Sequence, residues 1–132
     1  MSTPHKNHSP GFLALVKDAM SRVKEIDIAQ YKAMPSTKHV LIDVREDHEW
    51  QAGHAAGALH LSKGTIERDI ENAIPDKSTG LVLYCGGGFR SALVADNLQK
   101  MGYTGALSLG GGWRAWNEAA MPVEKPAEKA SS

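Results

Sequence analysis

The stretch GLVLYCGGGFRSALVADNL, residues 80–98, decides the fold of this 132-residue chain. It begins with an apolar run, which is typical of a strand buried on both faces of a parallel sheet. The segment 91–101 then places Val94, Leu98 and Met101 on one helical face. The stretch therefore predicts a strand, a glycine-rich turn and a helix, which together are a building unit of α/β domains.

The rest of the chain repeats this alternation of short apolar runs and helical spacing. Further strands are predicted near 25–26 and at 39–44, 57–61 and 105–109. Helices are predicted at 11–24, 28–34, 62–72 and 111–121, with one or two helical turns over 46–54. The order indicates an α/β domain with a mostly parallel sheet covered by helices on both faces. Ligands bind beyond the carboxyl ends of the strands in such sheets, and Cys85 stands at one of these ends.

Composition argues against several classes of protein. Fifteen basic and fifteen acidic residues balance, so the net charge favours neither nucleic acid nor an anionic membrane as a partner. No apolar run approaches the ~20 residues that span a bilayer, and the first ten residues lack the apolar core of a secretory signal. A single cysteine cannot form an internal disulfide, so a cytoplasmic protein is expected. The six histidines form no compact ligand cluster with Cys85, and no metal site is expected.

The lone cysteine has two interpretations. It could be a small buried apolar residue, because free cysteine packs well in cores. Its position favours a nucleophile, since Gly86, Gly87 and Gly88 follow it and a helix begins a few residues later. Glycines allow positive φ and close approach of a ligand, and the free N–H groups of the loop and helix start attract an anion. Such a loop favours thiolate over thiol, and a β-branched residue at Gly87 is expected to crowd the anion site.

The segment from Cys85 to Ser91 resembles the active-site loop of the rhodanese-like sulfurtransferases, in which Cys is followed by four residues and then by Arg-Ser. Three other segments resemble family signatures in the same order: LIDVRE at 41–46, EWQAGHAAGALHL at 49–61 and LSLGGGWRAW at 107–116. Four motifs in the right order are together far more specific than any one of them.

The resemblance implies a single rhodanese-like domain over 25–122, with a five-stranded, mostly parallel sheet flanked by helices on both faces. Residues 1–24 are expected to add a polar start and an amphipathic N-terminal helix, whose apolar face packs on the domain or, alternatively, meets a membrane or partner. The segment 123–132, rich in Ala, Glu, Lys and Pro, is expected to be a disordered tail.

The resemblance also implies a reaction. The family takes sulfane sulfur from a donor such as thiosulfate, holds it as a persulfide on the residue that matches Cys85, and passes it to an acceptor. The acceptor is cyanide or a thiol, such as that of thioredoxin, glutathione or a carrier protein. This covalent chemistry requires neither a metal nor an organic cofactor.

The same resemblance assigns roles to the residues around the cysteine. The substrate-binding loop comprises Gly86, Gly87, Gly88, Phe89, Arg90 and Ser91. Gly86 stands where many relatives carry a basic residue, so the charge of the loop comes from its N–H groups and from Arg90. Structural support is expected from Asp43, Arg45, Glu49 and His54.

Two of the loop residues keep alternative roles. Arg90 either points at the bound anion or pairs with an acid such as Asp43 or Glu49. Ser91 either caps the helix or bonds to the thiolate.

Two other functions compete with sulfur transfer. One is a rhodanese-like binding module without catalysis, which would have no need of a reactive thiol in a glycine cradle. The other is a cysteine-based phosphatase or arsenate reductase on a related fold. Four residues separate Cys85 from Arg90, whereas the related phosphatases have five, and the shorter loop favours a sulfur atom over a phosphoryl group.

Overall fold

The computed structural model describes residues 8–126. Its central sheet has five parallel strands in the order β1 (Lys24–Ile26), β6 (Ala106–Leu109), β5 (Leu81–Tyr84), β2 (Val40–Asp43) and β4 (Leu59–His60). The five strands lie at the five predicted positions, although β1 (Lys-Glu-Ile) has only one apolar residue, and the predicted α/β fold with a five-stranded parallel sheet is confirmed.

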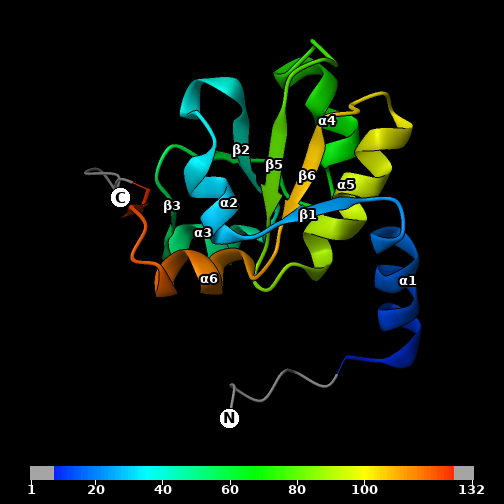
Figure 1. Cartoon of the computed structure of the whole chain (residues 1–132), viewed down its shortest axis with the longest axis horizontal. Helices are drawn as coiled ribbons and strands as arrows, with labels where there is room; N and C mark the ends of the chain where they lie inside the picture. The colour runs from blue at the N-terminus through cyan, green and yellow to red at the C-terminus, as the bar shows by residue number, and fades with distance from the viewer. Residues whose placement is uncertain (1–7, 127–132) are drawn as a thin grey trace.

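Helices cover both faces of this sheet (Figure 1). One side carries α1 (Pro10–Met20), α4 (Ile66–Ala73) and α5 (Phe89–Lys100), and the other carries α2 (Ile28–Ala33), α3 (Asp47–Ala52) and α6 (Gly112–Glu118). A short 3-10 turn, η1 (Ser36–Lys38), leads into β2. The two helix layers leave β5 buried on both faces, which is why its sequence is an uninterrupted apolar run.

The side chains of β5 alternate between two core clusters. Leu81 and Leu83 pack with the residues of α4 and α5, whereas Val82 and Tyr84 pack with Trp116 of α6 on the other face. The strand is therefore held on both sides, and the residue that follows it is fixed at the carboxyl edge of the sheet.

Helix α1 packs along α5, outside the five-stranded core. Ser9 caps its start by accepting a hydrogen bond from the Phe12 N–H at 3.4 Å. The helix ends at Met20, earlier than the predicted residue 24, because the chain turns there toward β1. Val16 and Ala19 are its buried residues. The predicted polar start lies mostly outside the described residues.

Arg22, just beyond α1, ties this helix to α5. Its guanidinium donates hydrogen bonds of 2.9 and 2.8 Å to the two carboxylate oxygens of Asp96. A second pair, to Asp18 at 2.8 Å, holds the same guanidinium from α1 itself. Within 8–126, no helix is long and apolar enough to cross a membrane.

A second, two-stranded sheet differs from the prediction. Strand β3 (His54–Ala55) pairs antiparallel with β7 (Val123–Glu124), so the first residues of the expected disordered tail are ordered. The Ala56 N–H also donates to the Pro122 carbonyl at 3.0 Å. This pairing depends on a neighbour far away in the sequence, which the composition of the tail does not reveal. The end of the predicted tail, 127–132, lies outside the described residues.

Candidate active site

Cys85 directly follows β5, at the carboxyl edge of the sheet. Its side chain is only 1% exposed and belongs to the core cluster on the α5 side. This burial is compatible with both interpretations of the cysteine, the packed apolar residue and the nucleophile. The groups that contact its sulfur distinguish between them.

Three hydrogen-bonding groups surround the Cys85 sulfur. The backbone N–H groups of Gly88 and Ser91 point at Sγ from 3.1 and 3.4 Å, and the Ser91 hydroxyl oxygen lies 3.6 Å away. These groups belong to the loop and first turn of α5, where backbone N–H groups have no partner within the helix. A ring of donors at a helix start stabilises negative charge on sulfur, which a core cysteine does not require.

The three glycines after Cys85 differ in backbone conformation. Only Gly88 has a left-handed backbone, with φ of +109°, and it is the glycine whose N–H donates to the sulfur. Gly87 does not have a positive φ, and a Cβ there would meet no protein atom within 4 Å, so the backbone of this position does not itself require glycine. The conformational requirement lies one residue further on, where the loop turns into α5.

The start of α6 closes over the back of the loop. The Trp113 N–H donates to the Cys85 carbonyl at 2.7 Å, and the Arg114 N–H donates to the Gly86 carbonyl at 3.2 Å. Gly112 permits this approach, because a Cβ there would overlap the Cys85 carbonyl. The closing glycine segment of the sequence therefore fixes the backbone of the loop.

Arg90 is paired with Glu49. Its two terminal nitrogens donate to the two carboxylate oxygens at 2.8 and 3.1 Å, which is one of the two alternatives that the sequence left open. The Arg90 hydrogen bonds lower the pKa of Glu49 from 4.5 to about 2. The pair with Glu49 raises the pKa of Arg90, and the negative charge of Cys85 raises it further. Arg90 therefore links the loop to α3 and lies close to Cys85.

Asp43 and Arg45 form a buried ion pair at the end of β2. The Arg45 guanidinium contacts the Asp43 carboxylate at 2.8 Å and also donates to the Gly53 carbonyl at 2.7 Å. Asp43 accepts a further hydrogen bond from the Tyr84 hydroxyl at 2.7 Å, and that hydroxyl accepts from the Ala55 N–H at 3.0 Å. Burial raises the pKa of Tyr84, so it stays a donor. This network joins β2, β5 and β3 beside the loop.

His54 belongs to the same supporting layer. Its Nδ1 lies 3.1 Å from the Trp50 carbonyl, and its ring stacks on the Trp50 ring with centroids 3.4 Å apart. The four predicted support residues thus fall into two groups: Glu49 is bonded to Arg90 of the loop, and the other three lie at the end of β2 and in β3.

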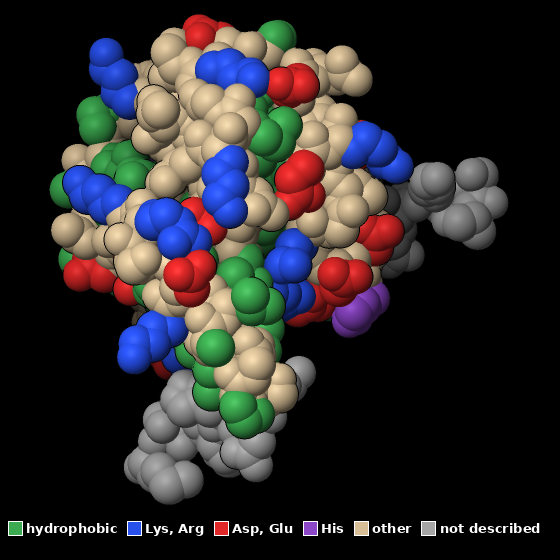
Figure 2. Space-filling view, turned by 90° about the vertical axis from the view of Figure 1, so that its right-hand side faces the viewer, with side chains coloured by type: hydrophobic (Ala, Val, Ile, Leu, Met, Phe, Trp, Pro, Cys, Tyr) green, Lys and Arg blue, Asp and Glu red, His purple; other side chains and the backbone are tan. Residues whose placement is uncertain are grey.

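Phe89 brings α1 into contact with the loop. Its ring lies 6.2 Å from that of Phe12 and 5.2 Å from that of His8, measured between centroids. Figure 2 faces this side of the molecule and shows hydrophobic side chains gathered on its lower part. Phe89 is 37% exposed, and Leu13 and Leu15 of α1 are exposed to a larger fraction.

Sequence reasoning missed three contributors to the site. The Tyr84 hydroxyl, the Ser108 hydroxyl and the missing side chain of Gly112 each touch the loop or its supports. Tyr84 and Ser108 lie in strands whose spacing shows burial but not which hydroxyl meets which partner. Three consecutive glycines at 110–112 were a signal that a backbone passes closely there.

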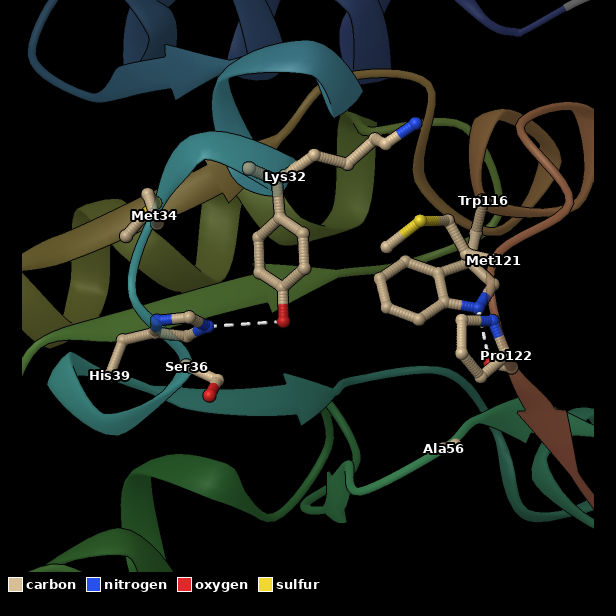
Figure 3. Close-up of a pocket in the computed structure, with 9 residues that line it drawn as sticks. Lys32, Met34, Ser36, His39, Ala56, Trp116, Met121 and Pro122 are labelled. Carbon is tan, nitrogen blue, oxygen red and sulfur yellow. Dashed lines mark hydrogen bonds between the residues drawn. The ribbon is translucent and has the colours of Figure 1, made fainter.

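A pocket elsewhere in the molecule does not include Cys85. It lies between α2 and α6, where Met34, Trp116 and Met121 line it (Figure 3). The hydrogen bond between His39 Nε2 and the Tyr31 hydroxyl, 3.1 Å long, crosses one side. Trp116 belongs to the core cluster on the face opposite that of Cys85, and Tyr31, Met34 and Met121 pack against it.

Comparison with known proteins identifies the class. The model of the rhodanese-like domain family matches residues 27–119, and the chain belongs to that family. A curated relative, thiosulfate sulfurtransferase GlpE of Pseudomonas entomophila, is 34% identical over 97 residues, which cover 74% of this chain and 87% of the relative. The sulfurtransferase predicted from the sequence agrees with the activity for which that relative is named.

Two solved structures have the same fold over most of their length. The polysulfide-sulfur transferase homodimer of Wolinella succinogenes has a TM-score of 0.73 and 25% identity, with 91% of each chain covered. A protein of unknown function from Rhodopseudomonas palustris, titled a possible tyrosine phosphatase, has a TM-score of 0.78 and 27% identity, with 90% of this chain and 98% of that chain covered.

Proposed function

We propose that this protein is a sulfurtransferase that carries sulfane sulfur as a persulfide on Cys85. The observation that carries the proposal is the ring of N–H groups from Gly88 and Ser91 around the sulfur of the only cysteine in the chain. This ring suits a negative sulfur before the reaction and a negative persulfide after it.

The first half-reaction loads the enzyme. The Cys85 thiolate attacks the outer sulfur of thiosulfate, a new S–S bond forms, and the S–S bond of thiosulfate breaks as its electron pair leaves with sulfite. The loop N–H groups hold the charge that the persulfide then carries. Arg90 adds positive charge near the sulfur, but its ion pair with Glu49 neutralises part of that charge.

The second half-reaction unloads the enzyme. Cyanide or a thiolate attacks the terminal sulfur, the Cys85–sulfur bond breaks, and the thiolate returns. Because Cys85 is 1% exposed, the acceptor must present its reacting atom on a narrow extension. Among thiols, this burial supports glutathione before thioredoxin or a carrier protein. The reducing cytoplasm, which supplies such thiols, is the proposed compartment.

A phosphatase is the second candidate, because a structural relative carries that title. In this chain the bidentate pair with Glu49 uses the Arg90 nitrogens that would have to hold phosphoryl oxygens. The loop also has one residue fewer than those of the related phosphatases. Both observations support sulfur as the cargo.

Steady-state kinetics test the proposal. With thiosulfate and cyanide as varied substrates, a persulfide intermediate predicts parallel double-reciprocal lines, and Cys85→Ser is expected to lose turnover. Intersecting lines, or turnover that survives in Cys85→Ser, would contradict it. A folding control, the unfolding midpoint of the variant, is expected to stay close to that of the unmodified protein.

A further inference from the structure

Ser108 is a fully buried hydroxyl in β6, on the side of the sheet that faces α5. It pairs in register with Leu83 of β5, whose side chain belongs to the core cluster on that side. A hydroxyl among apolar neighbours is costly unless it is hydrogen-bonded. Its partner is the Ser91 hydroxyl, at an oxygen–oxygen distance of 2.8 Å.

The direction of this hydrogen bond follows from counting hydrogens. Within residues 8–126, Ser91 is the only hydrogen-bond partner of the Ser108 side chain. Ser91 has two other neighbours, the Gly88 carbonyl at 3.3 Å and the Cys85 sulfur at 3.6 Å. If Ser91 donated to Ser108, the Ser108 hydrogen would have no acceptor in a buried place.

Donation from Ser108 to Ser91 satisfies both hydroxyls. The Ser91 hydrogen is then left for the Gly88 carbonyl or for the Cys85 sulfur. A charged acceptor takes a hydrogen bond more strongly than a neutral one. When the sulfur is negative, the Ser91 hydrogen therefore turns toward it and becomes the third donor of the ring.

We infer that Ser108 is a positioning residue, which orients the Ser91 hydroxyl toward the negative sulfur of Cys85 and so stabilises the thiolate. The inference deepens the proposed function and rests on it. Ser108 touches neither the sulfur nor a substrate, and its effect passes entirely through Ser91. This dependence makes the inference testable by a double-mutant cycle.

The test compares Ser108→Ala, Ser91→Ala and the double variant with the unmodified protein. Two quantities are measured: the thiolate fraction, by its ultraviolet absorbance at neutral pH, and the rate of persulfide formation from thiosulfate. Ser108→Ala is expected to lower the rate about two- to tenfold, the range for one hydrogen bond, and to lower the thiolate fraction. In the Ser91→Ala background the same change is expected to do almost nothing.

Two controls separate positioning from general damage. Ser108→Thr keeps the hydroxyl and is expected to restore the thiolate fraction. Tyr103→Phe removes a different buried hydroxyl, from the core cluster on the α5 side, which bonds to the Ile74 carbonyl at 2.6 Å, and is expected to leave the thiolate fraction unchanged.

Either of two results would overturn the inference. One is an unchanged thiolate fraction in Ser108→Ala, and the other is an equal effect with and without Ser91. Failure of the proposed function has a different signature, since the unmodified protein would then take up no sulfur from any donor while the thiolate absorbance still responded to Ser108→Ala.

Discussion

The backbone groups next to Cys85 determine the chemical environment of its sulfur. The sulfur is buried, yet it faces N–H groups of Gly88 and Ser91 instead of the apolar contacts that a core cysteine would have on every side. Burial strengthens such hydrogen bonds, because water does not compete for the donors. The donors are main-chain groups, so their aim depends on the conformation of the loop.

The glycines provide the first prediction. Gly88→Ala is expected to lower the rate of sulfur transfer about tenfold or more, since a left-handed backbone costs a residue with a side chain roughly 1–2 kcal/mol and relaxing it would move the donor N–H. Gly87→Ala is the matched control and is expected to stay within about twofold of the unmodified rate, because the space there is open. The rates come from a cyanide acceptor assay. Equal losses in both variants would show that loop conformation is not the cause.

Glu49 provides a prediction about pH. Its pKa falls from 4.5 in the unfolded chain to about 2 in the folded protein, so its pair with Arg90 stabilises the fold above about pH 4.5. This contribution is lost as the pH falls from there toward about 2. Glu49→Gln removes the titrating group, and its unfolding free energy is expected to change less across this window than that of the unmodified protein.

Urea unfolding at several pH values measures this difference. Asp69→Asn is the control, because the Asp69–Arg68 pair is largely exposed and contributes little. The account of Glu49 is contradicted if Glu49→Gln and the unmodified protein lose the same free energy between about pH 5 and about pH 2.

Individual residues also mark the limit of sequence reasoning at the site. The position of Cys85 after a buried strand and before glycines and a helix predicts a sulfur that faces backbone N–H groups, and two such groups lie at the sulfur in the structure. The glycine that carries the positive φ, and the partner of Arg90, depend on packing between segments far apart in the chain. Ser108 lies in an apolar strand, where the sequence shows a buried hydroxyl but not its neighbour on α5.

At the scale of elements, the middle of the sheet was predictable because its three central strands, β6, β5 and β2, are largely buried. Apolar runs of four or five residues between helices carry that information directly. The pair formed by β3 and β7 has only two residues in each strand, and no apolar periodicity fits in so short a length. Its formation depends on the chain returning after α6, which local sequence does not encode.

Helix α1 is the one helix that lies outside the matched family domain among the described residues, and its packing on α5 can be measured. Val16→Ala removes two buried carbons and is expected to lower the free energy of unfolding by about 1.6 kcal/mol, from roughly 0.8 kcal/mol for each carbon. Leu15→Ala, one residue away and 61% exposed, is expected to have little effect. Urea denaturation gives both values, and equal losses for the two variants would show that α1 does not pack through its Val16 face.

At the scale of the whole molecule, the fold alone does not determine whether the cysteine carries a sulfur atom or a phosphoryl group. Sulfur enzymes and cysteine phosphatases both place a thiolate at the start of a helix, and both cargoes are anions. The choice lies in loop length and in the use of Arg90, which here binds Glu49. We expect the protein to hydrolyse aryl phosphates at a negligible rate. A chromogenic aryl phosphate assay, with Cys85→Ser as the blank, checks this, and substantial Cys85-dependent hydrolysis would contradict it.

The most direct test of the central claim is the intact mass of the protein after incubation with thiosulfate and removal of the donor. The account predicts a gain of one sulfur atom, its loss on addition of cyanide, and no gain in Cys85→Ser. A panel that also includes polysulfide and glutathione persulfide allows for a donor other than thiosulfate. If the unmodified protein gains no sulfur from any of these donors, or if Cys85→Ser gains it equally, then Cys85 is not the sulfur carrier and the account is wrong.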